Sequence, residues 1–251
     1  MIEVHEVSRA FVHGRGRARK VVQAVDRVSF TAADGCITGL LGSNGAGKTT
    51  TLRMVAALLE PDQGAIAVDG IDAVHDAVGV RSRLGMLGDQ RGLYPRLSAR
   101  ENIVYHARLH GLCDEEAQAR AEHLAAVLDL GPLLDRRTEG FSQGERMKTA
   151  LARALVHDPP NIVLDEPTNG LDVVAIRALR EALRRLRDVE RKCIVISTHV
   201  MQEVERLCDQ VVVMARGRTV AEGSVPQLCR RAGCEDFEQA FVTLAFDARE
   251  G

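Results

Sequence analysis

The sequence predicts an α/β fold with a mixed central sheet, an antiparallel β subdomain at the N-terminus and an all-helical insertion. Two strand-like runs at 2–11 and 21–30 come first and are typical of a hairpin. Short apolar runs of the kind found in buried strands then alternate with helical spacing. These runs lie at 37–41, 161–164 and 193–196. From Ser98 to about Asp135 the spacing is helical throughout, which predicts the insertion.

Length and composition favour an ordinary globular protein. With 251 residues, 45% hydrophobic, the chain can bury the core of one large domain. A net charge of -2 lacks the basic excess of a nucleic-acid binder, so we expect no nucleic-acid partner. No apolar run approaches the roughly 18 residues of a membrane span, and the first residues lack a signal-peptide pattern. We therefore expect a cytoplasmic protein.

The predicted hairpin contributes two features. Its connector carries Arg15, Arg17, Arg19 and Lys20, which are either a solvated loop or a contact to lipid phosphates. Phe11 ends the first strand, where its ring can stack on an adenine or pack in the core.

A glycine-rich loop follows the apolar run 37–41 and precedes a helical pattern at 50–59. It consists of Gly42, Ser43, Asn44, Gly45, Ala46, Gly47, Lys48 and Thr49, which match G-x-x-x-x-G-K-[ST], and Thr50 begins the helix. Glycines let the backbone turn around an anion, and the positive end of the helix strengthens the field there. Lys48 can reach the β- and γ-phosphates, and Thr49 can hold Mg²⁺. The loop predicts a nucleoside triphosphate site.

The helical insertion has its own start and stop signals. Ser98 and Glu101 have capping-box spacing, Asp114 opens a second helix, and Gly131-Pro132 ends it. We expect a helical subdomain at about 96–140 within a domain spanning 1–234.

Two further polar stretches lie at the start of a predicted helix and at the end of a predicted strand. Ser142 and Glu145 again fit a capping box, and a capped helix start is itself an anion site. Asp165 and Glu166 follow the buried strand 161–164, at the edge where parallel sheets place ligands. Asp165 can hold Mg²⁺ with Thr49. Glu166 can act on the attacking water as general base or as its positioner, the alternative being a plain helix-capping turn.

The last third completes the sheet. His199 follows the strand 193–196 and can hydrogen-bond a γ-phosphate. Asp172 caps a helix at 173–188, whose outward arginines form a solvated face: Arg180, Arg184, Arg185 and Arg187. Residues 235–251 form a short amphipathic tail, with Phe237 and Phe241 on one face, that packs on its own domain or makes a dimer or regulatory contact.

The motifs in this order resemble an ATP-binding cassette (ABC) ATPase, from Ile2 to roughly Leu228. The segment 141–145 corresponds to the family signature L-S-G-G-Q, 162–166 to the second nucleotide motif, 169–172 to the D-loop, and His199 to the switch histidine. The resemblance implies the P-loop NTPase fold, ATP hydrolysis with Mg²⁺, and catalytic roles for Lys48, Glu166 and His199. It also implies ATP contacts from Ser142, Gln143, Gly144, Glu145 and Asp172.

In the family, the signature faces the ATP of another subunit, so the resemblance implies an ATP-bound dimer of cassettes, expected here as a homodimer. Two departures occur. Gln143 and Glu145 replace a glycine and the glutamine of the signature. Alignment of the 84–88 strand puts Asp89 rather than Gln90 at the Q-loop position, where an aspartate can still coordinate Mg²⁺ or water.

The segment 89–102 resembles exporter-type cassettes that pair with separate permeases, including the NatA-like sodium-efflux type. This implies an ATPase subunit held on the inner face of the membrane by an integral-membrane permease, with 89–96 and the helical insertion at the contact. A soluble ABC ATPase acting on a cytosolic assembly is the alternative. A degenerate, non-enzymatic cassette is disfavoured because Lys48, Asp165, Glu166 and His199 are all present.

Overall fold

A computed structural model describes residues 1–14, 20–88 and 92–246. Its larger sheet has the strand order β10-β9-β3-β8-β7-β6. The strands are β3 (Cys36–Leu41), β6 (Leu84–Leu87), β7 (Asn161–Asp165), β8 (Cys193–Thr198), β9 (Gln210–Ala215) and β10 (Arg218–Gly223). Only the β9–β10 pair of this sheet is antiparallel. The predicted mixed sheet is confirmed.

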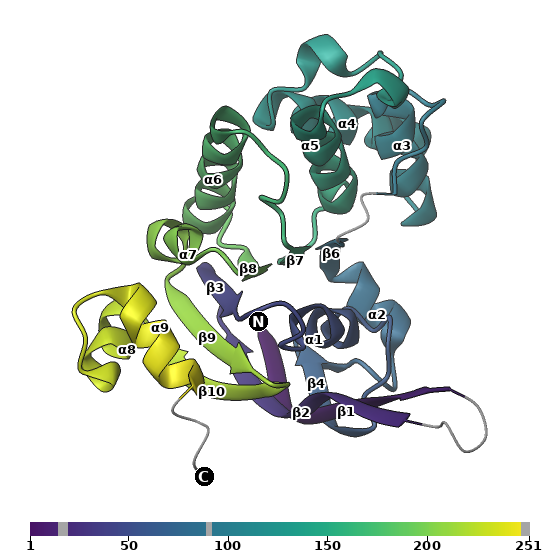
Figure 1. Cartoon of the computed structure of the whole chain (residues 1–251). Coiled ribbons are helices and arrows are strands. Elements are labelled where there is room, and N and C mark those ends of the chain that lie inside the picture. The colour runs from purple at the N-terminus through teal and green to yellow at the C-terminus, as the bar shows by residue number, and fades with distance from the viewer. Residues whose placement is uncertain (15–19, 89–91, 247–251) are drawn as a thin grey trace.

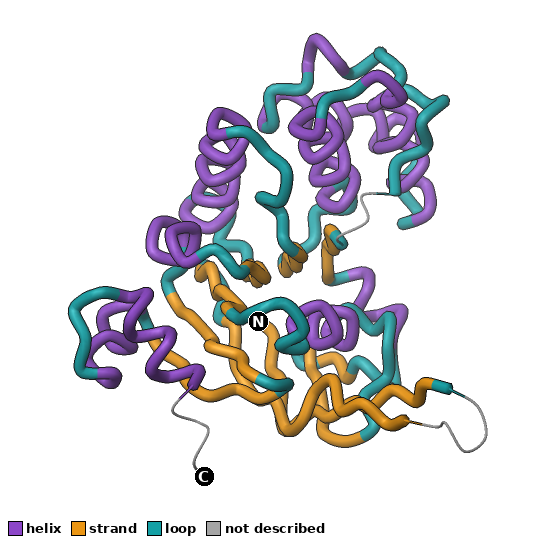
Figure 2. Tube along the Cα trace, viewed as in Figure 1, coloured by secondary structure: helices purple, strands orange, loops and turns teal. Residues whose placement is uncertain are grey.

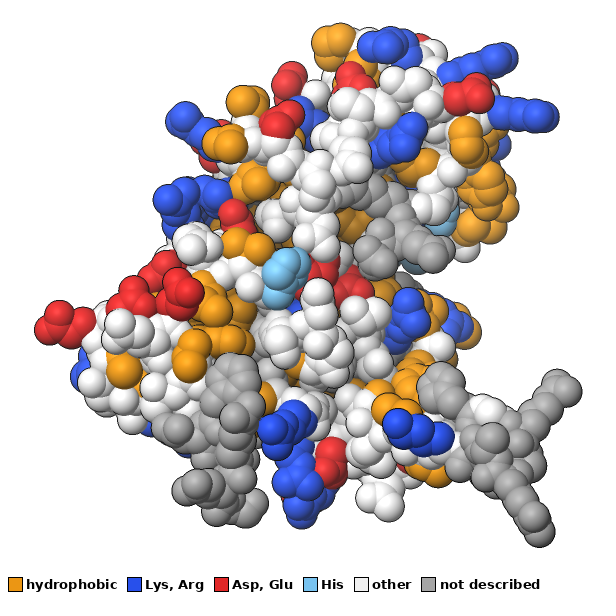
Figure 3. Space-filling model, in the orientation of Figure 1, with side chains coloured by type: hydrophobic (Ala, Val, Ile, Leu, Met, Phe, Trp, Pro, Cys, Tyr) orange, Lys and Arg blue, Asp and Glu red, His pale blue; other side chains and the backbone are white. Residues whose placement is uncertain are grey.

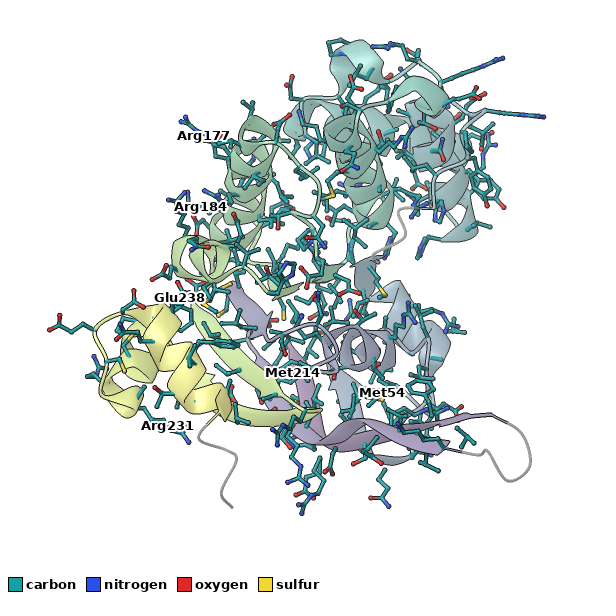
Figure 4. All side chains as sticks on the ribbon, in the orientation of Figure 1. Met54, Arg177, Arg184, Met214, Arg231 and Glu238 are labelled. Carbon is teal, nitrogen blue, oxygen red and sulfur yellow. The ribbon has the colours of Figure 1, made fainter. Side chains whose placement is uncertain are left out.

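A second, antiparallel sheet has the order β2-β1-β4-β5 and contains the N-terminus (Figure 1). It consists of β1 (Ile2–His13), β2 (Lys20–Ala32), β4 (Gln63–Val68) and β5 (Ile71–Asp72). Helix α1 (Lys48–Val55) shares an apolar core with both sheets. Met54 of α1 and Met214 of β9 are fully buried in this core (Figure 4). The predicted antiparallel subdomain is confirmed, whereas β5 and the short α2 (Ala77–Ser82) were not predicted.

Three helices lie together at the top of Figure 1: α3 (Ala99–Leu109), α4 (Asp114–Val127) and α5 (Gln143–Leu155). They bury Ile103, Ala121 and Leu151 in one core, and 3-10 turns at Gly131–Leu133 and Thr138–Gly140 connect α4 to α5. Ser98 and Glu101 form the predicted capping box of α3. The helix α5, which the sequence places after the insertion, packs directly on α3 and α4.

The remaining helices lie beside the mixed sheet (Figure 2). They are α6 (Val173–Asp188), α7 (Met201–Leu207), α8 (Val225–Ala232) and α9 (Phe237–Phe246). On α6, Arg177 and Arg184 project away from the sheet (Figure 4). The predicted solvated face is wrong for Arg180, which is 16% exposed and binds the buried Glu203 with its guanidinium 2.9 Å from the carboxylate.

The C-terminal helix α9 packs on its own chain, one of the two alternatives for the tail. Phe237 and Phe241 are buried with Val211 of β9 and Leu228 of α8. The basic connector residues Arg15, Arg17 and Arg19 lie outside the described residues, as do Asp89 and Gln90. In the described part of the chain, no helix combines the length and the apolar character needed to cross a bilayer.

Candidate functional site

Three neighbouring strands of the mixed sheet bring the predicted site together. Strands β3, β8 and β7 are parallel and adjacent, so their carboxyl ends lie along one edge. In the register, Leu41 is opposite Thr198, and Ser197 is opposite Asp165. The loop after β3, the end of β7 and the end of β8 therefore meet, with β8 in the middle.

The glycine loop is held in shape by its neighbours. Gly47 has φ 98°, and a Cβ there would lie 2.5 Å from the carbonyl oxygen of Ala24 on β2. The carbonyl of Ala46 accepts the N–H of Gly217 at 3.1 Å, which ties the loop to the β9–β10 turn. Gly47 also caps α1 without a side chain, and α1 has no acid in its first turn. The helix start thus faces the loop with its amides and its positive dipole.

A cavity of about 500 Å³ opens over this loop. Phe11 and Ala24 line one part of it, and Glu166 and His199 line another. The loop itself contributes Asn44, Gly45, Ala46, Gly47, Lys48, Thr49 and Thr50. Acidic side chains and a histidine gather in the hollowed middle of this face, between the helices α3–α5 and the sheets (Figure 3). The aromatic residue, the phosphate loop and the two candidate catalytic side chains therefore share one cavity.

Lys48, Glu166 and His199 form a continuous polar chain. The Lys48 ammonium donates to the carbonyl of Gly42 at 2.7 Å and lies 3.3 Å from Oε1 of Glu166. The other carboxylate oxygen, Oε2, lies 2.9 Å from Nδ1 of His199. Lys48 and Glu166 are 6% and 12% exposed, and His199 is 42% exposed. A nearly buried cation and a carboxylate thus stand at the start of α1, with a histidine at the solvent side.

Asp165 fits the predicted metal position. Its Oδ1 accepts hydrogen bonds from Thr49 Oγ1 at 3.2 Å and from Ser197 Oγ at 2.5 Å. Its Oδ2 is buried without a hydrogen-bond partner among the described residues. A buried carboxylate oxygen without a partner is unfavourable unless a ligand completes it, and a cation does so. Within the described ranges no cluster of three His, Cys, Asp or Glu side chains could hold a metal ion.

One residue of the site was missed by sequence reasoning. Ser197 is fully buried, and its hydroxyl accepts the backbone N–H of Glu166 at 3.0 Å while donating to Asp165. Its place near the end of a predicted buried strand was visible, but its partners on β7 depend on strand order, which local sequence does not encode.

The signature residues lie elsewhere. Ser142 caps α5: its hydroxyl accepts the N–H of Glu145 at 3.2 Å, and the Glu145 carboxylate accepts the N–H of Ser142 at 2.7 Å. None of the residues 142–145 lines the cavity over the glycine loop. Gln143 lines a separate cavity of about 680 Å³ that reaches Asp165 and Glu166 from the side of α5. Asp172 is exposed and caps α6 through the N–H of Ala175 at 2.8 Å.

Comparison with known proteins shows the family of this chain. The family model described as ABC transporter matches residues 25–169, more than half of the chain. The chain is 44% identical to the ABC transporter ATP-binding protein NatA of Bacillus subtilis, with 97% of each chain covered. It is 40% identical to the Nod factor export ATP-binding protein I of Burkholderia lata over 85% of this chain and 70% of that one.

A solved dimeric bacterial ABC transporter cassette superposes with a TM-score of 0.80 at 25% identity, covering 89% of this chain and 98% of that one. The fold, the convergence of the motifs on one cavity and the relatives lead to the same result. The chain belongs to the ABC transporter family as an ATP-binding subunit of the NatA-like type, and it is an ATPase.

Proposed function

We propose that ATP binds in the cavity over the glycine loop. The half-buried Phe11 would stack on the adenine, and the loop amides with Lys48 would hold the phosphates. Thr49 and Asp165 would hold Mg²⁺, because the unpartnered Oδ2 of Asp165 needs a cation. When bound, Mg²⁺ would neutralise charge on the β- and γ-phosphates.

Glu166 is the residue proposed to act on the attacking water, as general base or as its positioner. Its carboxylate is held between Lys48 at 3.3 Å and His199 at 2.9 Å. Phosphates compete for the same Lys48 ammonium, so ATP draws Lys48 away from Glu166 and leaves a stronger proton acceptor. His199 then orients Glu166 and reaches the γ-phosphate from the solvent side.

The active unit in this proposal is a dimer. The single chain places Ser142, Gln143, Gly144, Glu145 and Asp172 outside the cavity over the glycine loop. A second copy, arranged head to tail, would bring the start of α5 against that cavity and complete it. The likeness to a dimeric cassette supports this arrangement. ATP would then lie between two copies of the chain.

The substrate of the whole assembly is expected to leave the cell through a separate permease. The name of the Burkholderia lata relative describes export, which supports this direction. An exposed apolar surface on α3 and the segment before it suits a protein contact: Tyr94 and Tyr105 meet edge to face at 5.5 Å, and Leu109 is 64% exposed. We propose that this surface binds the permease on the inner face of the membrane. Sodium as the transported ion stays a prediction from the subfamily resemblance.

The single observation that carries the proposed chemistry is the Lys48–Glu166–His199 chain beside the glycine loop. Glu166→Gln should keep ATP binding and lose turnover, by about 10²- to 10⁴-fold, because the amide cannot take a proton from water. Full turnover in that variant, measured as phosphate release, would show that Glu166 has another role.

The same variant tests the partner. Tagged Glu166→Gln, purified from membranes with ATP and Mg²⁺, should retain a multi-span membrane protein that mass spectrometry identifies. Adding Leu109→Arg should remove that protein, whereas Val189→Arg, at an equally exposed valine just after α6, should not. Recovery of soluble partners alone would favour an ABC ATPase acting on a cytosolic assembly instead.

A further inference from the structure

We infer that Ser197 is a positioning residue that holds both the proposed magnesium ligand Asp165 and the proposed base Glu166 in their places. This inference rests on the proposed metal role of Asp165. Ser197 is fully buried near the end of β8, directly opposite Asp165 of β7 in the sheet register. Its hydroxyl hydrogen-bonds both Asp165 and Glu166.

The Ser197 hydroxyl makes one bond in each direction. As donor it binds Oδ1 of Asp165 at 2.5 Å, a short bond of the kind a hydroxyl makes to a carboxylate. As acceptor it takes the backbone N–H of Glu166 at 3.0 Å. Because a hydroxyl has one proton, donation to Asp165 leaves its lone pairs for the N–H of Glu166. Both bonds are therefore satisfied at once.

The bond to Asp165 decides which oxygen can meet the cation. Ser197 and Thr49 both bind Oδ1, and Oδ2 is left buried without a partner among the described residues. A carboxylate fixed by two donors on one oxygen cannot turn freely, so Oδ2 keeps its direction. Outer hydrogen bonds of this kind orient metal ligands, and their loss typically weakens metal affinity or activity about 10- to 100-fold.

The bond to Glu166 holds a strained backbone. Glu166 has φ 46°, a left-handed conformation that is unfavourable for a residue with a side chain. Its N–H bond to Ser197 fixes the turn that points the carboxylate at Lys48 and His199. The same hydroxyl thus controls both the metal side and the water side of the site.

Neighbouring hydroxyls show that burial alone does not produce this pattern. Thr38, on the adjacent strand β3, is also fully buried, and its Oγ1 has no partner among the described residues. Thr198 uses its hydroxyl to accept the N–H of Val200 and shape the loop after β8. Of these three hydroxyls, that of Ser197 is the one that contacts the candidate catalytic residues.

The test compares Ser197→Ala, Ser197→Thr and the control Thr38→Val in the full chain. Ser197→Ala should lower ATP turnover about 10- to 100-fold and weaken Mn²⁺ binding to a similar degree. Mn²⁺ stands in for Mg²⁺ and is followed by electron paramagnetic resonance with a non-hydrolysable ATP analogue. ATP affinity without metal should stay within about twofold, because Lys48 and the loop are untouched. Ser197→Thr should restore both properties, and Thr38→Val should resemble the wild type.

Asp165→Asn separates this inference from the proposed metal site. If Asp165→Asn loses Mn²⁺ binding while Ser197→Ala keeps wild-type Mn²⁺ binding and turnover, the metal site stands and the positioning role is wrong. If Asp165→Asn keeps Mn²⁺ binding, the metal site and the inference both fall. Should Ser197→Ala not fold, Ser197→Cys keeps the volume with a weaker donor, and wild-type behaviour there also overturns the inference.

Discussion

Two of the helices that begin at predicted nucleotide-binding residues, α1 and α5, start in opposite ways. The cap of α1 is Gly47, which has no side chain to satisfy the first amides, and the first turn contains no acid. The cap of α5 is Ser142, which exchanges hydrogen bonds with Glu145 in a complete capping box. One helix start is therefore open to an anion, and the other is already satisfied.

This difference suggests an order of events. The open start of α1 has Lys48 beside it, so phosphates are attracted to a single chain. The start of α5 carries the Glu145 carboxylate, which opposes a second anion. Phosphates should bind first at α1, and α5 of a second copy should join only once the nucleotide is in place.

The largest effect should come from removing the cation at α1. Lys48→Ala should weaken ATP binding by a single chain about 10- to 100-fold, because charge-assisted hydrogen bonds contribute about 1.5–3 kcal/mol. Equilibrium binding of a fluorescent ATP analogue measures this. Arg146→Ala, in the first turn of α5, is the control and should leave single-chain affinity unchanged. An equal loss in both variants would contradict the contrast between the helices.

A smaller effect, a gain in dimer affinity, should follow from removing the negative charge at the start of α5. Glu145→Gln keeps an oxygen for the N–H of Ser142 but loses the negative charge. ATP-dependent dimerisation should strengthen about two- to fivefold, since a charge at a helix start is worth about 0.3–1 kcal/mol. Sedimentation in a Glu166→Gln background measures it.

The matched control is Glu116→Gln. Glu116 occupies the same capping-box position in α4, where its carboxylate accepts the N–H of Cys113 at 3.1 Å. Its substitution should not change dimerisation. If Glu145→Gln weakens the dimer, the start of α5 does not face a phosphate.

An effect on stability rather than on binding concerns the other end of α5. There His157 stacks on His110 at 3.7 Å, and burial, with the nearby His110, lowers the pKa of His157 to about 4. The unfolded chain has the ordinary pKa of 6.5, so it binds more protons between these values. The free energy of unfolding therefore keeps its full value above about pH 7 and falls as the pH drops through 6.5 towards 4.

His157→Phe should reduce this loss of stability at low pH. We expect the melting temperature of the wild type to fall by a few degrees more than that of the variant between pH 7.5 and pH 5. His5→Phe, at an exposed histidine, is the control. A residual fall is expected in His157→Phe, because burial also lowers the pKa of His106 to about 4. Identical pH profiles for all three proteins would show that His157 does not contribute.

Local signals explain what the sequence predicts well. The glycine loop and the caps Ser98, Ser142 and Asp172 each depend on residues within a few positions, so their pattern is visible in the chain. The buried strands follow from apolar runs bounded by turns. These signals are sufficient for the fold class and for most of the candidate site.

Contacts between distant segments explain what was missed. Arg180 looked solvated because its partner Glu203 lies on another helix, and Ser197 looked ordinary because its partners lie on β7. The packing of α5 on α3 and α4 also depends on tertiary contacts. Helix α8 is a different case, since Ser224 and Gln227 form a capping box that local reading passed over.

The attachment of the glycine loop to its surroundings has a consequence for binding entropy. The loop is held by β2 on one side and by the Gly217 turn on the other, with Asp26 also donating to Gly217 at 2.7 Å. A flexible loop would have to be ordered by its ligand, at a cost of about 1–2 kcal/mol per residue. Folding has already ordered this loop, so the free energy of nucleotide binding is not reduced by the entropy cost of immobilising the chain. A substitution at Gly217, which is remote in sequence, should therefore lower the affinity of the loop for phosphate.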